Sequence, residues 1–222
     1  MDQDYSYSFE WDSRYCYPKS NVLKNKMGIT NGEDLQLAER EITAVRTAVV
    51  QANGIGGNFD LEHLQRIHKY LFGDVYSWAG ELRQVDISKG NAFCHWAFIQ
   101  NNAETLFANL QKELPFKGLS QDEVAQRLSF YLSEINVLHP FREGNGRSQR
   151  LFIQLLAQEL GYSLDFSKIS PHEMIVASAE SFACDYSKMD SIFKKIISPL
   201  PSMVQDISLP QGDLGENDEY EH

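Results

Sequence analysis

The chain has 222 residues, of which 42% are hydrophobic and 12% aromatic, so it is long enough to bury one substantial core. Its formal net charge of −11 argues against a surface built to bind nucleic acid or an anionic membrane. The N-terminus has no apolar run, and the cysteines are odd in number and widely spaced. We therefore expect a cytoplasmic protein with free thiols; secretion through signals of another kind is the alternative.

Three regions differ in composition. Residues 1–14 are polar and aromatic without periodicity, which predicts an N-terminal arm. Residues 15–200 carry the periodic segments of a single domain. Residues 201–222 contain acidic residues but no Lys or Arg, a composition that stays solvated, and they predict a disordered tail.

The domain is predicted to be mainly α. Apolar residues recur at helical spacing in 34–51, in a segment that opens at Asp60, and in 99–114, 120–138, 151–160, 170–184 and 186–197. The glycine cluster at 54–57 lacks the Lys and Ser/Thr of a nucleotide-binding P-loop, so we interpret it as a connecting loop. His63 and His68 are five residues apart on different helix faces, and we do not expect them to bind a metal.

One segment breaks the helical pattern. Residues 82–87 alternate apolar with polar side chains, 88–91 form a turn signal, and 92–96 can return as a second strand. This predicts a β-hairpin beside the helices. An isolated hairpin is only marginally stable, so it either packs as a plain structural element or is kept for its exposed edge.

The strongest chemical signal is the stretch from His139 to Arg150. His139 can act as a general base near neutral pH, and Pro140 ends the preceding helix so that the ring lies at a corner. Glu143 offers the hard oxygen ligands that Mg²⁺ prefers beside nucleotide phosphates. We expect the ring to open on a cleft rather than to lie inside the core.

The residues that follow predict an anion site. Gly144, Asn145 and Gly146 present backbone N–H groups where the next helix begins, and the two glycines allow an anion to approach closely. Arg147 and Arg150 are spaced i, i+3, so they share one helix face and can hold neighbouring phosphates. An ordinary turn would explain the glycines, but it would explain neither the arginines nor the histidine.

These twelve residues fill every specified position of H-P-F-x-[D/E]-G-N-G-R-x-x-R, and the chain resembles the Fic family from about Tyr15 to about Ile197. The resemblance implies a Fic fold, a helical bundle with a small β-hairpin "flap" beside the active-site loop. It also implies a protein adenylyltransferase that moves AMP from ATP to a hydroxyl of a target protein. The implied roles are a base (His139), a Mg²⁺ ligand (Glu143), an anion hole (Gly144, Asn145, Gly146) and two clamps on the β- and γ-phosphates (Arg147, Arg150).

The same resemblance implies that the flap pairs with an extended segment of the target and presents its hydroxyl to the base. Asp86, Ile87 and Lys89 are the candidate target-binding residues of the flap. The target is expected to be the ATPase subunit of a type II topoisomerase if the chain is a bacterial toxin, or a host GTPase if it is a secreted effector.

Regulation is the last expectation. Many Fic proteins are inhibited by a helix with the pattern [S/T]-x-x-x-E-[G/N], whose glutamate pairs with the second motif arginine, here Arg150. Neither Ser6–Glu10 nor Gly212–Asn217 fits this pattern fully. We therefore expect the inhibitory helix to come from a small antitoxin partner. Two other functions remain open, a phosphotransferase like the related Doc toxins, which carry lysine where this chain has Gly146, and a binding protein without turnover.

Overall fold

The computed structural model describes residues 13–89 and 91–201. Residues 1–12 of the predicted arm, the two candidate inhibitory segments at 6–10 and 212–217, and all but the first residue of the predicted tail lie outside the described residues. No helix in the described part of the chain is long and apolar enough to cross a bilayer.

The described residues form a mainly α-helical fold, as the sequence predicted. The helices are α1 (Gly32–Asn53), α2 (Leu61–Phe72), α3 (Ile99–Glu113), α4 (Gln121–Leu138), α5 (Asn145–Glu159), α6 (Pro171–Phe182) and α7 (Ser187–Ile196). Short 3₁₀ turns η1 (Trp96–Phe98) and η2 (Phe166–Lys168) precede α3 and α6.

Local capping explains where these helices start. The Asn31 side chain accepts from the backbone amides of Glu33 and Asp34, and Asp60 accepts from the amide of His63. Ser120 and Ser170 each form a capping box with the glutamate three residues later. Each cap satisfies amides that have no carbonyl one turn earlier, so the predicted starts of α1, α2, α4 and α6 lie within two residues of the observed ones.

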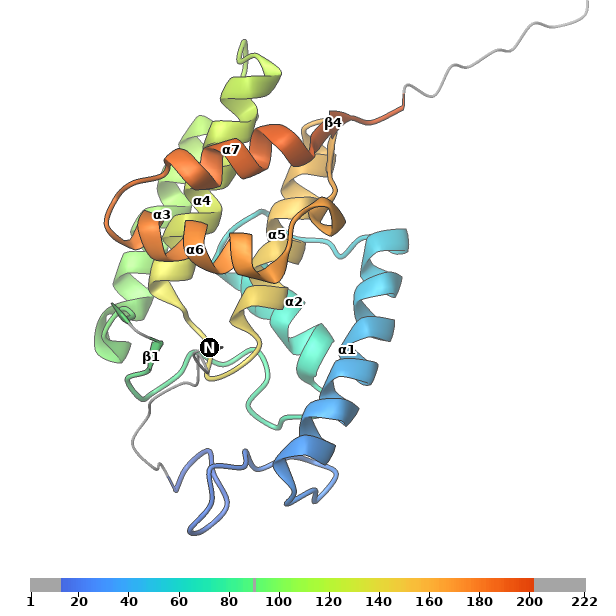
Figure 1. The fold of residues 1–222 in the computed structure, drawn as a ribbon, viewed down its shortest axis with the longest axis vertical. Helices are drawn as coiled ribbons and strands as arrows, with labels where there is room; N and C mark the ends of the chain where they lie inside the picture. Colours follow the sequence, from blue (N-terminus) through green and yellow to red (C-terminus); the bar gives the residue numbers. More distant parts are fainter. Residues whose placement is uncertain (1–12, 90, 202–222) are drawn as a thin grey trace, which may run out of the picture.

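Helix α5 lies at the centre of the bundle (Figure 1). It contacts α4 on one side and α2 on another, while α7 and α6 pack on α4 and α1 packs on α2. The loop between α4 and α5, which carries the motif, therefore connects two helices that are buried along much of their length. Figure 1 places α1 at the edge of the molecule, away from α6 and α7.

The predicted hairpin exists, but its strands are much shorter than expected. β1 (Ser88–Lys89) pairs with β2 (Asn91–Ala92), so Ser88, Lys89 and Asn91, which were predicted as part of the turn, lie in the strands. Beyond the strands the Phe93 amide still donates to Ile87, but the amides of Arg83 and Cys94 donate to the carbonyls of Pro140 and Val137 in the motif corner. A second sheet, β3 (Tyr162–Leu164) with β4 (Ile197–Pro199), was not predicted.

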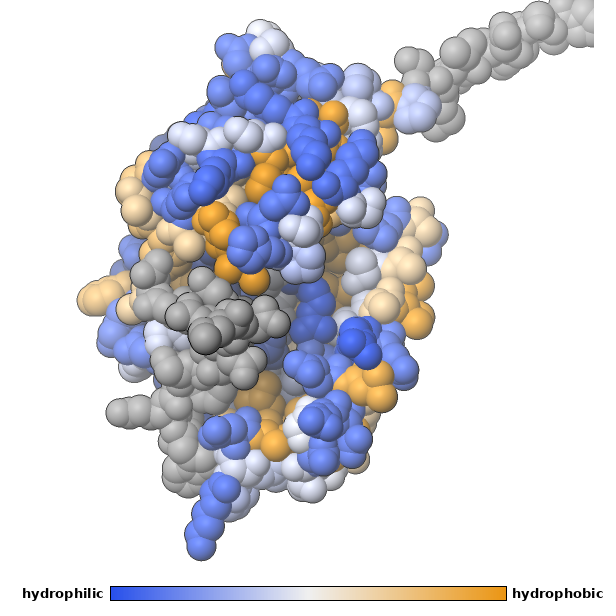
Figure 2. Space-filling view, viewed as in Figure 1, coloured by the Kyte–Doolittle hydropathy of each residue, from blue (hydrophilic) through white to orange (hydrophobic). Residues whose placement is uncertain are grey.

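Helix α1 departs from the sequence expectation on its outer face. The apolar residues at helical spacing in 34–51 include Leu37, Val45 and Val49, but their side chains are 47%, 67% and 40% exposed. Ala44 and Ala48 are exposed on the same face. The hydrophobic colour along the right-hand edge of Figure 2 lies over this helix. We call Leu37, Ala44, Val45, Ala48 and Val49 the α1 stripe.

Candidate active site

His139 lies at the corner between α4 and the motif loop, as predicted. It ends α4 in the left-handed conformation (φ 45°), which turns the chain into Pro140. Its Nδ1 lies 3.3 Å from the carbonyl oxygen of Asn136. This contact favours the tautomer with the proton on Nδ1, in which Nε2 carries the lone pair that a base needs.

The ring of His139 is more buried than we expected. The residue is only 4% exposed, and the ring of Phe93, just after β2, stacks on it with centroids 3.7 Å apart. Phe93 is supported in turn by Phe182 of α6, at 5.5 Å. The expectation of a ring that opens directly on a cleft was wrong, because the end of the flap folds over the imidazole.

The motif loop is closed by its own asparagine. The Asn145 side chain accepts from the amide of Phe141 at 2.8 Å and donates to the carbonyl of Phe141 at 2.7 Å. The side chain is therefore used to hold the loop, and only the backbone of Asn145 is left for the predicted anion hole. Phe141 is fully buried, which anchors the loop in the core.

His68 of α2 fixes the far side of this loop. Its ring stacks on Phe141 at 3.8 Å, its Nδ1 accepts from the Gly80 amide at 2.8 Å, and its Nε2 lies 2.9 Å from the carbonyl oxygen of Glu143. The ring must carry its proton on Nε2 to make both bonds. Burial lowers the pKa of His68 to about 3. No local sequence pattern around His68 indicates this role.

Stability should therefore depend on pH through His68. The unfolded chain takes up a proton near pH 6.5, whereas folded His68 stays neutral to about pH 3. The unfolded state thus binds more protons between these values, so stability falls as pH is lowered, by up to about 1.4 kcal/mol per pH unit. Urea unfolding at pH 7, 6 and 5 should show a shallower dependence in His68→Gln. The exposed His172→Gln is the control; equal slopes in all three proteins would contradict the assignment.

The fold gives Gly144 a second reason to be glycine, besides the predicted anion hole. Its φ is +79°, and a Cβ at this position would lie 2.3 Å from the ring of Phe72. The missing side chain thus makes room for the ring of Phe72 in the core. The first amides of α5 still have no carbonyl one turn earlier and no side-chain cap, so the helix start can receive negative charge.

Arg147 is already engaged. Its guanidinium forms an ion pair with the buried Glu39 of α1, donates to Thr43 Oγ1 at 3.1 Å and lies over the Phe72 ring at 4.7 Å. Tyr76 donates its hydroxyl to the other oxygen of Glu39. We expected two arginines open to phosphate; Glu39, whose role the sequence did not reveal, neutralises one of them.

Arg150, unlike Arg147, is not engaged by another side chain in the described part of the chain. No described residue forms a hydrogen bond or ion pair with it, and burial, together with the charge of Arg147, lowers its pKa. A cavity of about 340 Å³ lies beside the two arginines, and Thr47, Gln154, Asp165 and Ser167 are among its lining residues. A half-buried cation without a partner favours an anionic ligand. Arg150 is therefore the stronger candidate for a phosphate contact.

Glu143 fits a role as a Mg²⁺ ligand that acts together with phosphates. Its side chain is 27% exposed, Oε1 accepts from the Gly144 amide at 2.9 Å, and Arg147 lies 3.8 Å away. Burial raises the pKa of Glu143, and the charge of Glu39 adds to the effect. The described residues contain no group of three His, Cys, Asp or Glu that could hold a metal alone. Mg²⁺ commonly completes such a site with phosphate oxygens and water.

The three candidate target-binding residues of the flap have different environments in the structure. Asp86 accepts from the Trp96 amide at 2.9 Å and lies 3.3 Å from Nε2 of His95. Ile87 is only 4% exposed, so its side chain is turned away from the surface where we expected it to contact a target. Lys89 lies in β1 opposite Asn91.

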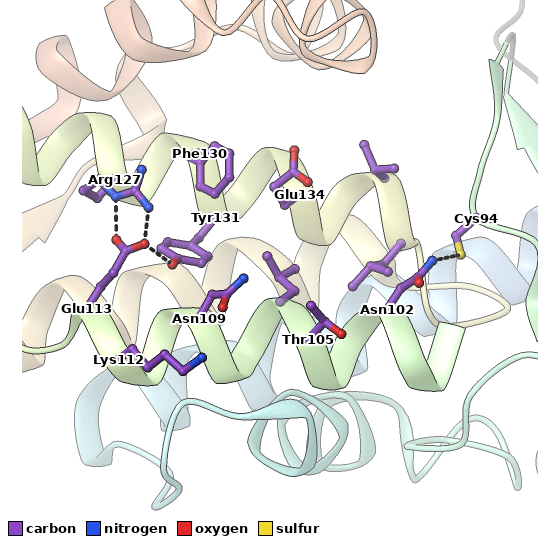
Figure 3. Close-up of a pocket in the computed structure, with 13 residues that line it drawn as sticks. Cys94, Asn102, Thr105, Asn109, Lys112, Glu113, Arg127, Phe130, Tyr131 and Glu134 are labelled. Atoms are coloured by element: carbon purple, nitrogen blue, oxygen red, sulfur yellow. Dashed lines mark hydrogen bonds and ion pairs between the residues drawn. The ribbon is translucent and has the colours of Figure 1, made fainter. Parts of the chain in front are cut away.

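A separate cavity of about 620 Å³ lies between α3 and α4 (Figure 3). Arg127 Nε donates to Glu113 at 2.7 Å there, and Tyr131 donates to the same carboxylate. None of the predicted motif residues lines this cavity. The motif and the cavity are thus distinct features of the fold.

Comparison with known proteins identifies the family. The model of the Fic/DOC family matches residues 58–157. A "Probable protein adenylyltransferase Fic" of Salmonella typhimurium is 39% identical over 185 residues, which cover 83% of this chain and 92% of the relative. The chain belongs to the Fic family. This Fic chain is also 40% identical to the protein adenylyltransferase VbhT of Bartonella schoenbuchensis over 182 residues, 82% of the chain but only 38% of that longer relative.

Solved Fic domains share the fold. A VirB-translocated Bep effector protein of Bartonella quintana, solved with bound ADP, superposes with a TM-score of 0.80 at 32% identity, over 85% of this chain and 96% of the other. The BepC protein of Bartonella tribocorum, solved with bound AMPPNP, gives a TM-score of 0.78 at 28% identity, over 84% and 97%. Both neighbours bind an adenine nucleotide, and the predicted Fic fold with its hairpin is confirmed.

Proposed function

We propose that this Fic protein transfers AMP from ATP to a hydroxyl side chain of a target protein. The observation that carries the proposal is the arrangement of the motif: His139 ends α4, six residues before Asn145 starts α5, and Arg150 stands on the first turns of α5 without a described partner. A base and a phosphate site are thus held by one closed loop. The relatives named adenylyltransferases support this reading of the site.

In the proposed reaction the target hydroxyl attacks the α-phosphorus of ATP in line. His139 takes the hydroxyl proton on Nε2 as the new oxygen–phosphorus bond forms. The bond from the α-phosphorus to the bridging oxygen breaks, and pyrophosphate leaves. The amides at the start of α5 and the guanidinium of Arg150 stabilise the negative charge of the phosphates. Glu143 would hold Mg²⁺, which supplies positive charge to the phosphate oxygens when it is bound.

The geometry around Gly146 supports AMP transfer over a Doc-like phosphotransferase. A Cβ on Gly146 would lie 3.1 Å from Nη1 of Arg150. A lysine at this position, as in the Doc toxins, would require the end of the Arg150 side chain to shift from where we assign its phosphate contact. A glycine keeps the space open.

Isotope placement tests the function and its target together. Bacterial and eukaryotic lysates are incubated with the protein and either α-³²P-ATP or γ-³²P-ATP. AMP transfer predicts protein label from the α-position alone. Label from the γ-position alone would mean phosphoryl transfer, and no label in either lysate would mean a binding protein. A labelled topoisomerase ATPase subunit in the bacterial lysate, or a labelled GTPase in the eukaryotic one, would identify the target class.

We further propose that a small antitoxin holds the enzyme inactive by binding the α1 stripe and placing a carboxylate at Arg150. Two observations support this: several apolar side chains are exposed on one side of α1, and Thr47 and Gln51 of the same helix line the cavity beside Arg150. Exposed apolar stripes of this kind are typical of interaction sites. A chain that is inactive alone and becomes active when either terminus is trimmed would refute inhibition in trans.

A further inference from the structure

Arg83 is a buried cation to which the proposed chemistry gives no role. It is 1% exposed and lies between α2 and the flap, among the largest fully buried side chains of the described residues. Its Nη1 is 3.7 Å from Asp86, whose side chain is 56% exposed. Such a charge is normally excluded from a core unless its donors are all used.

The guanidinium instead donates to four backbone carbonyls. Nε donates to His139 at 2.8 Å, and Nη2 donates to Leu138 at 3.3 Å, so one edge holds the end of α4. Nη1 donates to Val85 at 2.6 Å, and Nη2 also donates to Cys94. Val85 precedes β1 and Cys94 follows β2, so this single side chain joins both legs of the flap to the corner that carries the base.

Two backbone hydrogen bonds also attach the flap to the corner that carries His139. The Arg83 amide donates to Pro140 at 2.8 Å, and the Cys94 amide donates to Val137 at 3.0 Å. Within the hairpin the strands have two residues each, and the Phe93 amide donates to Ile87 at 3.3 Å. The flap is therefore fixed to residues 137–140 in addition to its own short strand pairing.

Arginine suits this position chemically. Its planar guanidinium carries five N–H donors in a rigid fork, whereas the ammonium group of lysine is a compact charge with three. The last carbonyls of α4 have no intrahelical donor and carry the negative end of the helix dipole, which favours a cation there. Lysine can keep the charge, but it cannot reach carbonyls on three segments at once.

We propose that Arg83 is the positioning residue that holds the flap in register with His139, and so sets where an extended segment of the protein substrate meets the base. This inference rests on the proposed AMP transfer. Arg83 has no contact with Gly144, Gly146 or Arg150 among the described interactions, so its task lies on the target side of the site and not on the nucleotide side.

The test compares Arg83→Lys with Arg127→Lys. Arg127 forms a side-chain pair with Glu113 between α3 and α4, as Figure 3 shows, so its variant makes the same chemical change away from the flap. In R83K we expect amide hydrogen exchange in residues 84–95 to become about tenfold faster, because charge-assisted hydrogen bonds are lost there. Exchange in α2 and α5 should not change. R127K should leave the flap unchanged.

Two solution measurements complete the test. AMP transfer to the protein target should fall about 100-fold in kcat/KM in R83K, since a misplaced reacting group typically loses that much, while the Kd for ATP stays at the wild-type value. Flap exchange like that of the wild type, or an ATP affinity that falls in step with transfer, would overturn the proposal. If R83K does not fold, Arg83→Gln is judged by the same measurements. Hydrogen exchange does not depend on activity. It therefore still tests whether Arg83 holds the flap if the wild-type protein transfers no AMP.

Discussion

Replacing His139 with alanine should lower AMP transfer by about two to four powers of ten, the usual loss when a general base is removed. ATP binding should persist, because the phosphate contacts that we assign come from the start of α5 and from Arg150. The measurement is transfer from α-³²P-ATP to the target beside calorimetric binding of a non-hydrolysable ATP analogue.

A second variant separates chemistry from backbone strain. His139 has a positive φ, and Asn adopts this conformation more readily than Ala. His139→Asn should therefore fold at least as well as His139→Ala and should be equally inactive. Wild-type transfer in either variant would show that another group takes the proton.

The second large effect is expected at Gly144, where alanine should both destabilise the fold and abolish nucleotide binding. The left-handed conformation costs about 1–2 kcal/mol in a residue with a Cβ. The overlap with Phe72 adds about 1–3 kcal/mol of overpacking, and it shifts the loop that places the first amides of α5. Chemical unfolding and ATP-analogue binding measure the two consequences.

Gly118 provides the matched control. Its φ is +78°, almost the same as that of Gly144, but no atom lies within 4 Å of the Cβ that alanine would add. Gly118→Ala should therefore show the conformational loss alone and bind the analogue normally. If the two alanine variants lost the same stability and both kept binding, Phe72 would not explain the glycine at 144.

The helices could be predicted because their causes are local. Ser120 with Glu123 and Ser170 with Glu173 are pairs within one turn, and the apolar spacing of α4 runs directly to His139. The hairpin was predicted too long for the opposite reason. Alternation in 82–87 suggests a partner strand, but the amide of Arg83 pairs with Pro140, which no local pattern reveals.

The site residues were likewise predictable only where their arrangement is local in the sequence. The motif gave the order of base, carboxylate, amides and arginines along the chain. The motif could not show that Glu39 pairs with Arg147, or that His68 donates to the Glu143 carbonyl. These partners lie 108 and 75 residues away in the sequence. Residues at such separations meet only through the packing of α1 and α2 around α5. The α1 stripe shows the same limit, since periodicity does not distinguish a core face from an exposed apolar one.

The aromatic cover on His139 has a consequence for the resting enzyme. Water is the most abundant hydroxyl in the cell, and an open imidazole beside bound ATP would activate it as readily as a side chain. With Phe93 stacked on one face of the ring and braced by Phe182, the plane of the imidazole is fixed, and with it the in-plane direction along which Nε2 can accept a proton. Selection among hydroxyls would then rest on which of them can be brought into that plane, a constraint that a positioned side chain meets more readily than freely tumbling solvent.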